Sequence, residues 1–425
     1  MKQHRQFRTW LVRTFWCGLL FTVGFIWFYV ERQVPDHLNI IAEEPGEIHL
    51  QLPFGVTISC ESQEVSLGNG SDIPADEIRL STGQTLSLYG EKQGSYQLGM
   101  KLFGTVLFKE IQVDVVEPRY AIPCGAPVGI YLKASGILVI GTGRVTDTSG
   151  RESEPALGVL RSGDYIEAIN GKPLTSKEAL ITDLNQLDGA DAILRIRREG
   201  ETCETTVTPV RTSDGSYKIG AWVRDDTQGI GTMTYVENDG SFGALGHGIS
   251  DTDTGTIVEI DDGTLYETDI LGIEKGSAGT PGVMAGVIYY GPGTILGEIA
   301  ENTEVGIFGT VNQQMLESIH AQALPIGYRQ DVKKGKATIR SNVSGQPDDY
   351  EIEIQKVELN PIQKNKSMVI QVTDPRLLQL TGGIIQGMSG SPIIQDGRLI
   401  GAVTHVFIQD STRGYAIFVE DMLEH

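Results

Sequence analysis

A serine between two glycines near the C-terminus has the surroundings that best suit nucleophilic chemistry. Ser389 stands in the run GMSGSP (387–392), which leads into an apolar segment that predicts a strand. Glycines allow a turn tight enough to project the hydroxyl and to point nearby backbone N–H groups at one place, where they can hold a developing oxyanion. An α/β-hydrolase would need a glycine where Ser391 stands, so that fold is disfavoured.

A serine hydroxyl is a weak nucleophile until a base takes its proton, and histidine is the commonest base. His247 lies far upstream in the glycine-flanked run FGALGHGISD (242–251), which makes it the candidate base. His405 follows Ser389 after a predicted hairpin. The serine loop resembles that of chymotrypsin-like proteases, and this resemblance implies that His405 lines a specificity pocket; a histidine that only packs in a strand is the alternative.

A third residue, an acid, has to orient the imidazole and offset the charge that it gains. The C-terminal half offers many acids, among them Asp251, Asp253, Glu259, Asp261, Asp269 and Asp374. Their spacing does not choose among them, so the third member of the triad stays open at this point.

Length and charge limit the classes of protein to which these residues can belong. The 425 residues suffice for roughly three domains of about 150 residues each. The 34 basic and 55 acidic residues leave a net charge of −21, which repels nucleic acid. The four cysteines are widely spaced and form neither a metal motif nor a disulfide framework. We therefore expect no nucleic acid, no metal and no cofactor.

The N-terminus predicts a membrane anchor. Residues 14–30 carry no charge and would span about 26 Å as a helix, which Arg13 can lengthen by snorkelling. Basic residues precede this run, so we expect the N-terminus in the cytoplasm and everything after residue 33 outside. A cleaved signal peptide is the alternative, but no small-x-small cleavage site follows the run. Residues 1–33 are therefore assigned to the cytoplasmic N-terminus and a transmembrane anchor.

Two modules follow the anchor. From 34 to 118, short runs that alternate apolar and polar residues predict a small all-β module. From 119 to 212, the run LRSGDYIEAING (160–171) precedes a predicted helix at 176–186 and a strand at 192–196. This order resembles the PDZ domain, which binds an extended peptide by adding it to an edge strand. The resemblance implies a peptide-binding loop at Gly129, Ile130, Tyr131 and Leu132.

Residues 213–425 are rich in glycine and favour a double β-barrel, with one predicted helix between 311 and 323. The serine loop resembles that of chymotrypsin-like proteases, which implies an oxyanion hole made by the N–H groups of Gly387 and Ser389. The predicted fold class is therefore mostly β. It comprises an N-terminal transmembrane helix, a small β module, a PDZ domain and a chymotrypsin-like double β-barrel serine peptidase domain.

The order of these parts, with the run VTDPRLL (372–378) ahead of the serine loop, resembles the stage IV sporulation protein B family of serine peptidases. The resemblance implies the acid Asp374, and hence the catalytic residues His247, Asp374 and Ser389. It also implies a place between the two forespore membranes of endospore-forming bacteria. The implied activities there are self-cleavage and cleavage of a membrane-bound regulator of an intramembrane protease, which leads to late sigma-factor activation. The alternative is a non-enzymatic PDZ adaptor with a scaffolding C-terminal barrel.

Overall fold

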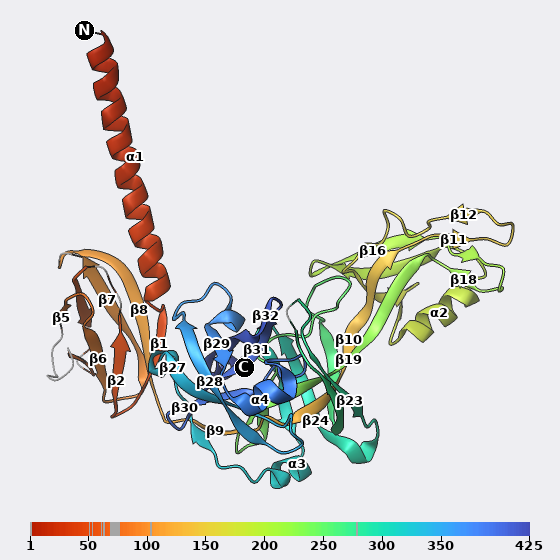
Figure 1. The fold of residues 1–425 in the computed structure, drawn as a ribbon. Helices are drawn as coiled ribbons and strands as arrows, with labels where there is room; N and C mark the ends of the chain where they lie inside the picture. Colours follow the sequence, from red (N-terminus) through yellow and green to blue (C-terminus); the bar gives the residue numbers. More distant parts are fainter. Residues whose placement is uncertain are drawn as a thin grey trace.

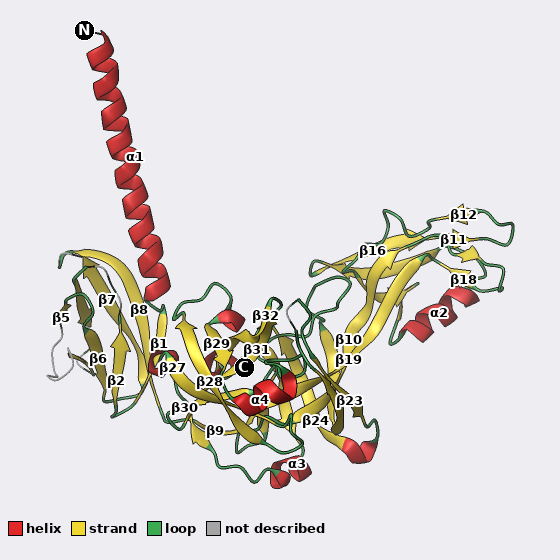
Figure 2. Cartoon of the chain, in the orientation of Figure 1, coloured by secondary structure: helices red, strands yellow, loops and turns green. Residues whose placement is uncertain are grey.

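The chain forms three β-rich bodies behind one long N-terminal helix (Figure 1). The computed structural model describes residues 2–50, 52, 54–60, 62, 64–68, 77–102, 104–277 and 279–425. Figure 1 shows helix α1 leading to a small β module, then a central body that holds the C-terminus, and a lobe that projects on the opposite side. Strands dominate all three bodies in Figure 2. The predicted mostly-β class is confirmed.

Helix α1, Lys2–Gln33, stands away from the three bodies (Figure 1). Its segment Trp10–Gln33 is long and apolar enough to cross a membrane. Large apolar side chains along it are exposed, as a lipid-facing surface requires, and Phe21 is 76% exposed. The end of the helix differs, since Val30 in its last turn and Val34 just after it are buried in the core of the β module.

The β module has two sheets that share one hydrophobic core. Buried Lys109 bonds Glu31 at 3.2 Å and Asp36 at 2.7 Å, which fixes the module to the end of α1. The five-stranded sheet has the order β1-β8-β7-β3-β5 and the three-stranded sheet the order β2-β6-β4. The bounds are β1 His37–Ile41, β2 Pro45–His49, β3 Val56–Cys60, β4 Val65–Gly68, β5 Glu77–Leu80, β6 Thr85–Gly90, β7 Gly94–Leu102 and β8 Val106–Val116.

The first barrel of the central body is a ring of six strands, β10-β21-β24-β25-β20-β19. The ring closes because β10 pairs with β19 as well as with β21: Ile130 lies opposite both Gly229 and Leu265. Buried apolar residues such as Val128 and Leu132 fill it. The bounds are β10 Pro127–Thr142, β19 Ala221–Val236, β20 Ser241–Ala244, β21 Ile260–Tyr266, β24 Ile295–Thr303 and β25 Gly306–Val311.

The second barrel is a closed ring of the order β27-β28-β29-β32-β31-β30. Alternate residues such as Ile339, Ile352 and Ile370 point into its core and are fully buried. The predicted double barrel is thus confirmed. The bounds are β27 Gly335–Ser341, β28 Asp348–Val357, β29 Met368–Val372, β30 Pro392–Gln395, β31 Arg398–Phe407 and β32 Asp410–Phe418, with helices α4 Pro375–Thr381 and α5 Val419–Met422.

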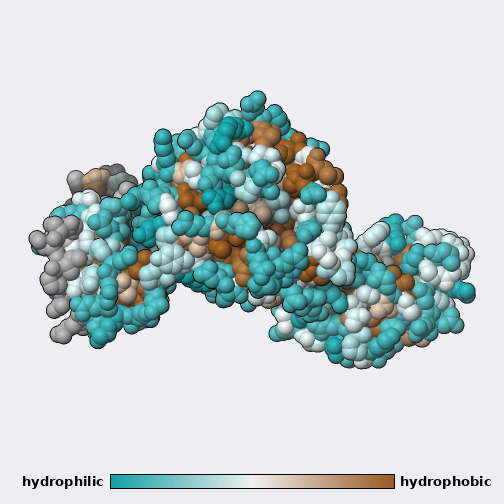
Figure 3. All heavy atoms as spheres, turned by 90° about the horizontal axis from the view of Figure 1, so that it is seen from below, coloured by the Kyte–Doolittle hydropathy of each residue, from teal (hydrophilic) through white to brown (hydrophobic). Residues whose placement is uncertain are grey.

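Smaller elements surround the barrels. The helix predicted between 311 and 323 is shorter, α3 Gln313–Ser318, and begins after Asn312, whose side chain accepts from the N–H of Met315 at 2.8 Å. The other elements are strands β9 Tyr120–Pro123, β22 Thr268–Glu274, β23 Val283–Ile288 and β26 Leu324–Pro325, and the 3-10 turns η1 Pro292–Thr294, η2 Arg329–Asp331 and η3 Lys364–Lys366. The face of the molecule seen in Figure 3 is mostly polar, with apolar patches gathered mainly over the central body.

The projecting lobe, residues 137–224, is inserted into the first barrel. Strands β10 and β19 have 16 residues each. Residues 127–134 of β10 lie in the barrel, whereas Ile137 and Leu138 pair with β13 in the lobe. The predicted boundaries at 119 and 212 are therefore corrected, because barrel strands lie on both sides of the lobe. A long strand carries no mark in its sequence of where it passes from one sheet to another.

The lobe has the elements that the PDZ resemblance predicts. Strand β13 turns into β14 at Asn170 and Gly171, whose positive φ angles of 49° and 77° suit a tight hairpin. Helix α2 begins after Ser176, whose hydroxyl accepts from the N–H of Ala179 at 3.2 Å. The bounds are β11 Val145–Thr146, β12 Glu152–Ser153, β13 Tyr165–Ile169, β14 Lys172–Pro173, α2 Lys177–Gln186, β15 Ala192–Arg198, β16 Glu201–Val207, β17 Val210–Arg211 and β18 Tyr217–Lys218.

Candidate active site

The serine loop lies between α4 and β30, and two glycines shape it. Gly387 and Gly390 have φ angles of +102° and +97°, which side chains rarely allow. A Cβ at Gly390 would lie 2.1 Å from the carbonyl oxygen of Thr232 in the first barrel. Only glycine fits there, so the loop can press against the first barrel.

Ser389 is half-buried at the junction of the two barrels. Its hydroxyl donates to the carbonyl oxygen of Thr404, in β31, at 2.8 Å. Attack on a substrate therefore requires the hydroxyl to turn from this carbonyl to a base.

His247 follows β20 through Leu245 and Gly246, whose φ angles are 70° and 68°. Its Nδ1 lies 2.9 Å from the carbonyl oxygen of Gly248. A carbonyl can only accept, so Nδ1 carries the proton and Nε2 of the neutral ring is free to act as a base. Burial lowers the pKa of His247, and the bond to Gly248 partly opposes this.

His405, in β31, contacts the ring of His247 with 4.9 Å between the ring centroids. Its Nδ1 is buried and has no hydrogen-bond partner among the described residues. Burial, the charge of His247 and the charge of Lys366 lower the pKa of His405 to about 4. His405 is therefore neutral at pH 7.

One cavity of about 710 Å³ brings these side chains together. Ser389, His247 and His405 all line it, and the middle of β19, residues 227–231, forms a wall. Predicted residues that lie far apart in the sequence thus meet between the barrels. The cavity is large enough to hold several side chains of an extended peptide.

An oxyanion hole needs backbone N–H groups of the serine loop that are not already hydrogen-bonded. The N–H groups of Met388, Gly390 and Ser391 donate to carbonyls of Ile385, Val403 and Met388. Within the described residues, no acceptor is bound by the N–H groups of Gly387 and Ser389, the two that the sequence assigns to the hole. Both remain free to bind a substrate oxygen.

Asp374 lies elsewhere. It caps helix α4, and its carboxylate accepts from Arg376 at 2.8–3.2 Å and from the N–H of Glu351 at 3.2 Å. The side chain of Arg376 and these N–H groups lower the pKa of Asp374 to about 2. Asp374 makes no hydrogen bond to His247 and is not among the lining residues of the cavity that His247 shares with Ser389. In this structure Asp374 is therefore a helix cap, and its role in orienting His247 stays a prediction.

None of the other candidate acids is the carboxylate that orients the imidazole of His247 in this structure. Within the described part of the chain, no carboxylate bonds His247. Asp251, the nearest in sequence, pairs with Arg224 and accepts from the N–H groups of Asp253 and Thr254. The carbonyl of Gly248 is thus the group that sets the tautomer of His247.

The predicted PDZ loop is wrong. Gly129, Ile130, Tyr131 and Leu132 form the middle of β10 and pair on both sides, with β19 and β21. Such a strand has no open edge for a peptide. The alternation of apolar residues is the same in a barrel strand as in a binding edge, so the sequence pattern cannot separate them.

Sequence reasoning missed two threonines of the site. The carbonyl of Thr404 accepts the hydrogen bond that the hydroxyl of Ser389 donates, and the hydroxyl of Thr232 donates to the carbonyl of Gly387 at 2.6 Å. Neither lies in a motif, so nothing in the local pattern marks them.

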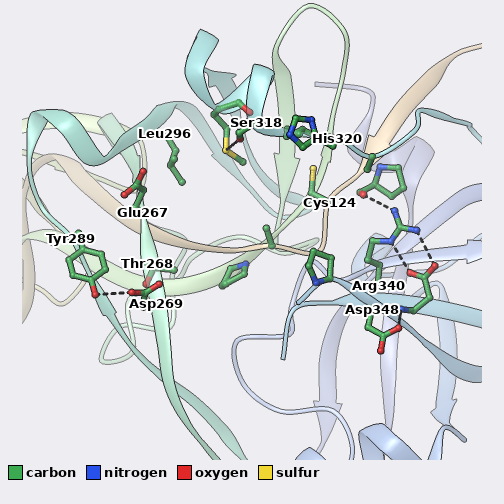
Figure 4. A pocket seen from close by; sticks show the side chains of 18 residues that line it. Cys124, Glu267, Thr268, Asp269, Tyr289, Leu296, Ser318, His320, Arg340 and Asp348 are labelled. Carbon is green, nitrogen blue, oxygen red and sulfur yellow. Dashed lines mark hydrogen bonds and ion pairs between the residues drawn. The ribbon is translucent and has the colours of Figure 1, made fainter. Parts of the chain in front are cut away.

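A second cavity, of about 780 Å³, contains none of the predicted catalytic residues (Figure 4). Figure 4 shows Cys124 near Arg340, which bonds Asp349 at 2.8 Å, and on the other side Tyr289 bonded to Asp269 at 2.9 Å. Burial raises the pKa of Cys124 to about 12, so it is a thiol rather than a nucleophilic thiolate.

The chain is similar to one known family and to solved structures of proteases. Residues 215–423 match the SpoIVB peptidase S55 family. No curated protein matches the chain. A solved structure of the HtrA-type protease AlgW with decapeptide is 15% identical with a TM-score of 0.28, over 47% of this chain and 52% of that one. The inactive form of Rv3671c from M. tuberculosis H37Rv, a serine-to-alanine mutant, is 14% identical with a TM-score of 0.24, over 46% and 80%. The chain thus spans about half the length of the AlgW structure.

Two closed barrels that bring an upstream histidine to a downstream serine place the protein in the class of chymotrypsin-like serine peptidases. Within that class, residues 215–423 match the SpoIVB peptidase S55 family, the family that the sequence was predicted to resemble.

Proposed function

We propose that this protein is a membrane-anchored serine endopeptidase in which Ser389 is the nucleophile and His247 the base. The N–H groups of Gly387 and Ser389 carry the proposal, because neither has a partner among the described residues and both lie beside a hydroxyl in the cavity that His247 also lines. In a structure where most buried N–H groups are paired, two free ones on a reactive loop suit an oxyanion.

The reaction uses these groups in two halves. The Ser389 oxygen attacks the scissile carbonyl while Nε2 of His247 takes its proton, and the N–H groups of Gly387 and Ser389 hold the oxyanion. His247 then gives the proton to the leaving amine, which leaves an acyl group on Ser389. Water, deprotonated by His247, releases the acyl group and restores the hydroxyl.

The family and the apolar helix support a finer proposal about substrates. The anchor would hold the peptidase outside the cytoplasm, by resemblance between the forespore membranes. There it would cleave itself and a membrane-bound regulator of an intramembrane protease. Anchoring enzyme and substrate in one membrane raises their effective concentration.

The lobe would dock extended chain during this cleavage. The first half of β19, residues 221–226, pairs with β10 on one edge, and no described strand pairs with the other. Trp222 on this strand and Ile181 on α2 are exposed apolar side chains. Trp222→Asp and Ile181→Asp should slow cleavage of a protein substrate while hydrolysis of a short peptide persists.

The proposed chemistry is tested with the full chain in detergent. A serine-directed phosphonate should form an adduct that mass spectrometry maps to Ser389, and Ser389→Ala should abolish both labelling and peptide hydrolysis. Ser391→Ala is the matched control, because the buried hydroxyl of Ser391 has no hydrogen-bond partner among the described residues. Undiminished hydrolysis by Ser389→Ala would sink the peptidase mechanism and favour the adaptor.

A further inference from the structure

We propose that Thr232 is a positioning residue that holds the oxyanion loop, residues 386–390, in the shape that catalysis needs. The inference rests on the proposed serine peptidase function and adds to it a residue from the opposite barrel.

Thr232 makes two hydrogen bonds to the oxyanion loop. It lies in β19 of the first barrel and is 1% exposed. Its hydroxyl donates to the carbonyl of Gly387 at 2.6 Å, and its N–H donates to the carbonyl of Ser389 at 3.2 Å. These are the two residues whose own N–H groups remain free. Thr232 thus bonds the carbonyl oxygens of both residues.

The loop needs such a restraint because of its glycines. Gly387, with its φ of +102°, can rotate its peptides at low cost. The preceding peptide is held by Met284, whose N–H donates to the carbonyl of Gln386 at 2.9 Å. The N–H and C=O of one peptide point in opposite directions, so this bond turns the N–H of Gly387 away from Met284. The hydroxyl of Thr232 fixes the next peptide, and Gly387 is restrained on both sides.

Thr232 also contacts the segment that carries the base. Its carbonyl accepts from the N–H of Leu245 at 3.2 Å, two residues before His247. A single residue therefore bonds the nucleophile loop and the base loop. This places it where a small shift would change the distance between Ser389 and His247, to which catalysis is sensitive.

The side-chain bond is tested with Thr232→Val, which keeps the N–H and the overall size but removes the hydroxyl. For a short peptide, we expect kcat to fall at least about tenfold, but less than the roughly 10²–10³-fold loss caused by deleting an oxyanion donor itself. KM should change little, because the contact matters in the transition state. Thr232→Ser keeps the hydroxyl and should restore most of kcat.

Thr234→Val is the matched control. Thr234 lies in the same strand, is fully buried, and its hydroxyl has no hydrogen-bond partner among the described residues. The same chemical change there should leave kcat unaltered. A similar effect of the two valine variants would mean that only burial is being measured, and would overturn the proposal.

Backbone amide hydrogen exchange in the full chain gives a readout that does not depend on activity. Exchange in residues 386–390 should be faster in Thr232→Val than in Thr234→Val. Unchanged kcat and unchanged exchange in Thr232→Val, with Ser389→Ala inactive, would refute the role of Thr232 and leave the peptidase intact. An active Ser389→Ala would refute the peptidase mechanism instead.

Discussion

The imidazole rings of His247 and His405 lie 4.9 Å apart between centroids and are tilted by 35°. His247 comes from the first barrel and His405 from the second, so the pair joins the two barrels beside Ser389. Burial lowers the pKa of both rings. Desolvation therefore keeps the base of the site neutral, and no carboxylate among the described residues bonds His247 to raise its pKa.

The first prediction concerns stability against pH. An unfolded histidine has a pKa of about 6.5, whereas that of folded His405 is about 4. Between these values the unfolded chain binds more protons, so the free energy of unfolding should fall as pH is lowered from 6.5 towards 4. His405→Phe should reduce this slope in urea unfolding of the full chain. Equal slopes for the two proteins would contradict the assignment.

The second prediction concerns activity against pH. Because burial lowers the pKa of His247, the free enzyme should retain its base below the ordinary histidine value. The acid limb of kcat/KM, measured with an uncharged peptide, should therefore have its midpoint below pH 6.5. A midpoint above 6.5 would point to a carboxylate that raises the pKa of His247 in the working enzyme.

The third prediction concerns Asp374. Asp374 caps a helix and pairs with Arg376. Asp374→Asn keeps a capping side chain but loses the charge, so the free energy of unfolding should fall by only about 1 kcal/mol. The loss of kcat per folded molecule should stay under about tenfold. A loss near the roughly 10⁴-fold seen when the triad acid of a serine protease becomes an amide would restore the role that the sequence implied.

The fourth prediction concerns the strand mistaken for a PDZ loop. Ile130 is buried in the first barrel, so Ile130→Asp should cost at least about 3 kcal/mol of unfolding free energy and abolish all cleavage. Ile193→Asp, at an exposed apolar position on β15 of the lobe, is the control and should leave the fold intact. A folded Ile130→Asp protein that hydrolyses peptides would show that residues 129–132 are not barrel core.

The fifth prediction concerns a buried ion cluster at the C-terminus. Arg329 pairs with Glu420 and, at 3.0 Å, with Asp421, all three of them buried. Arg329→Met would leave two buried carboxylates without their main cation and should lower the free energy of unfolding by about 3–5 kcal/mol. Arg144→Met, which breaks exposed pairs with Glu152 and Glu154, should change stability little.

Local signals in the sequence were enough for much of the fold. The uncharged run at 14–30 predicts a helix, Ser176 marks the start of α2, and Asn170 and Gly171 mark a hairpin, because each depends on residues adjacent in the chain. The loop of the glycine-flanked serine can likewise be recognised in the sequence, because residues adjacent in the chain form its turn.

Tertiary structure decided what depends on contacts between distant residues. Whether β10 lies in a barrel or in a lobe is set by β19 and β21, which alternation of apolar residues does not identify. Asp374 is held by Arg376 and Glu351 rather than by His247. The hydroxyl of Thr232 donates to the carbonyl of Gly387, which lies 155 positions away in the sequence. Such a bond forms only when both barrels have closed, because its two atoms belong to different cores and no local pattern brings them together.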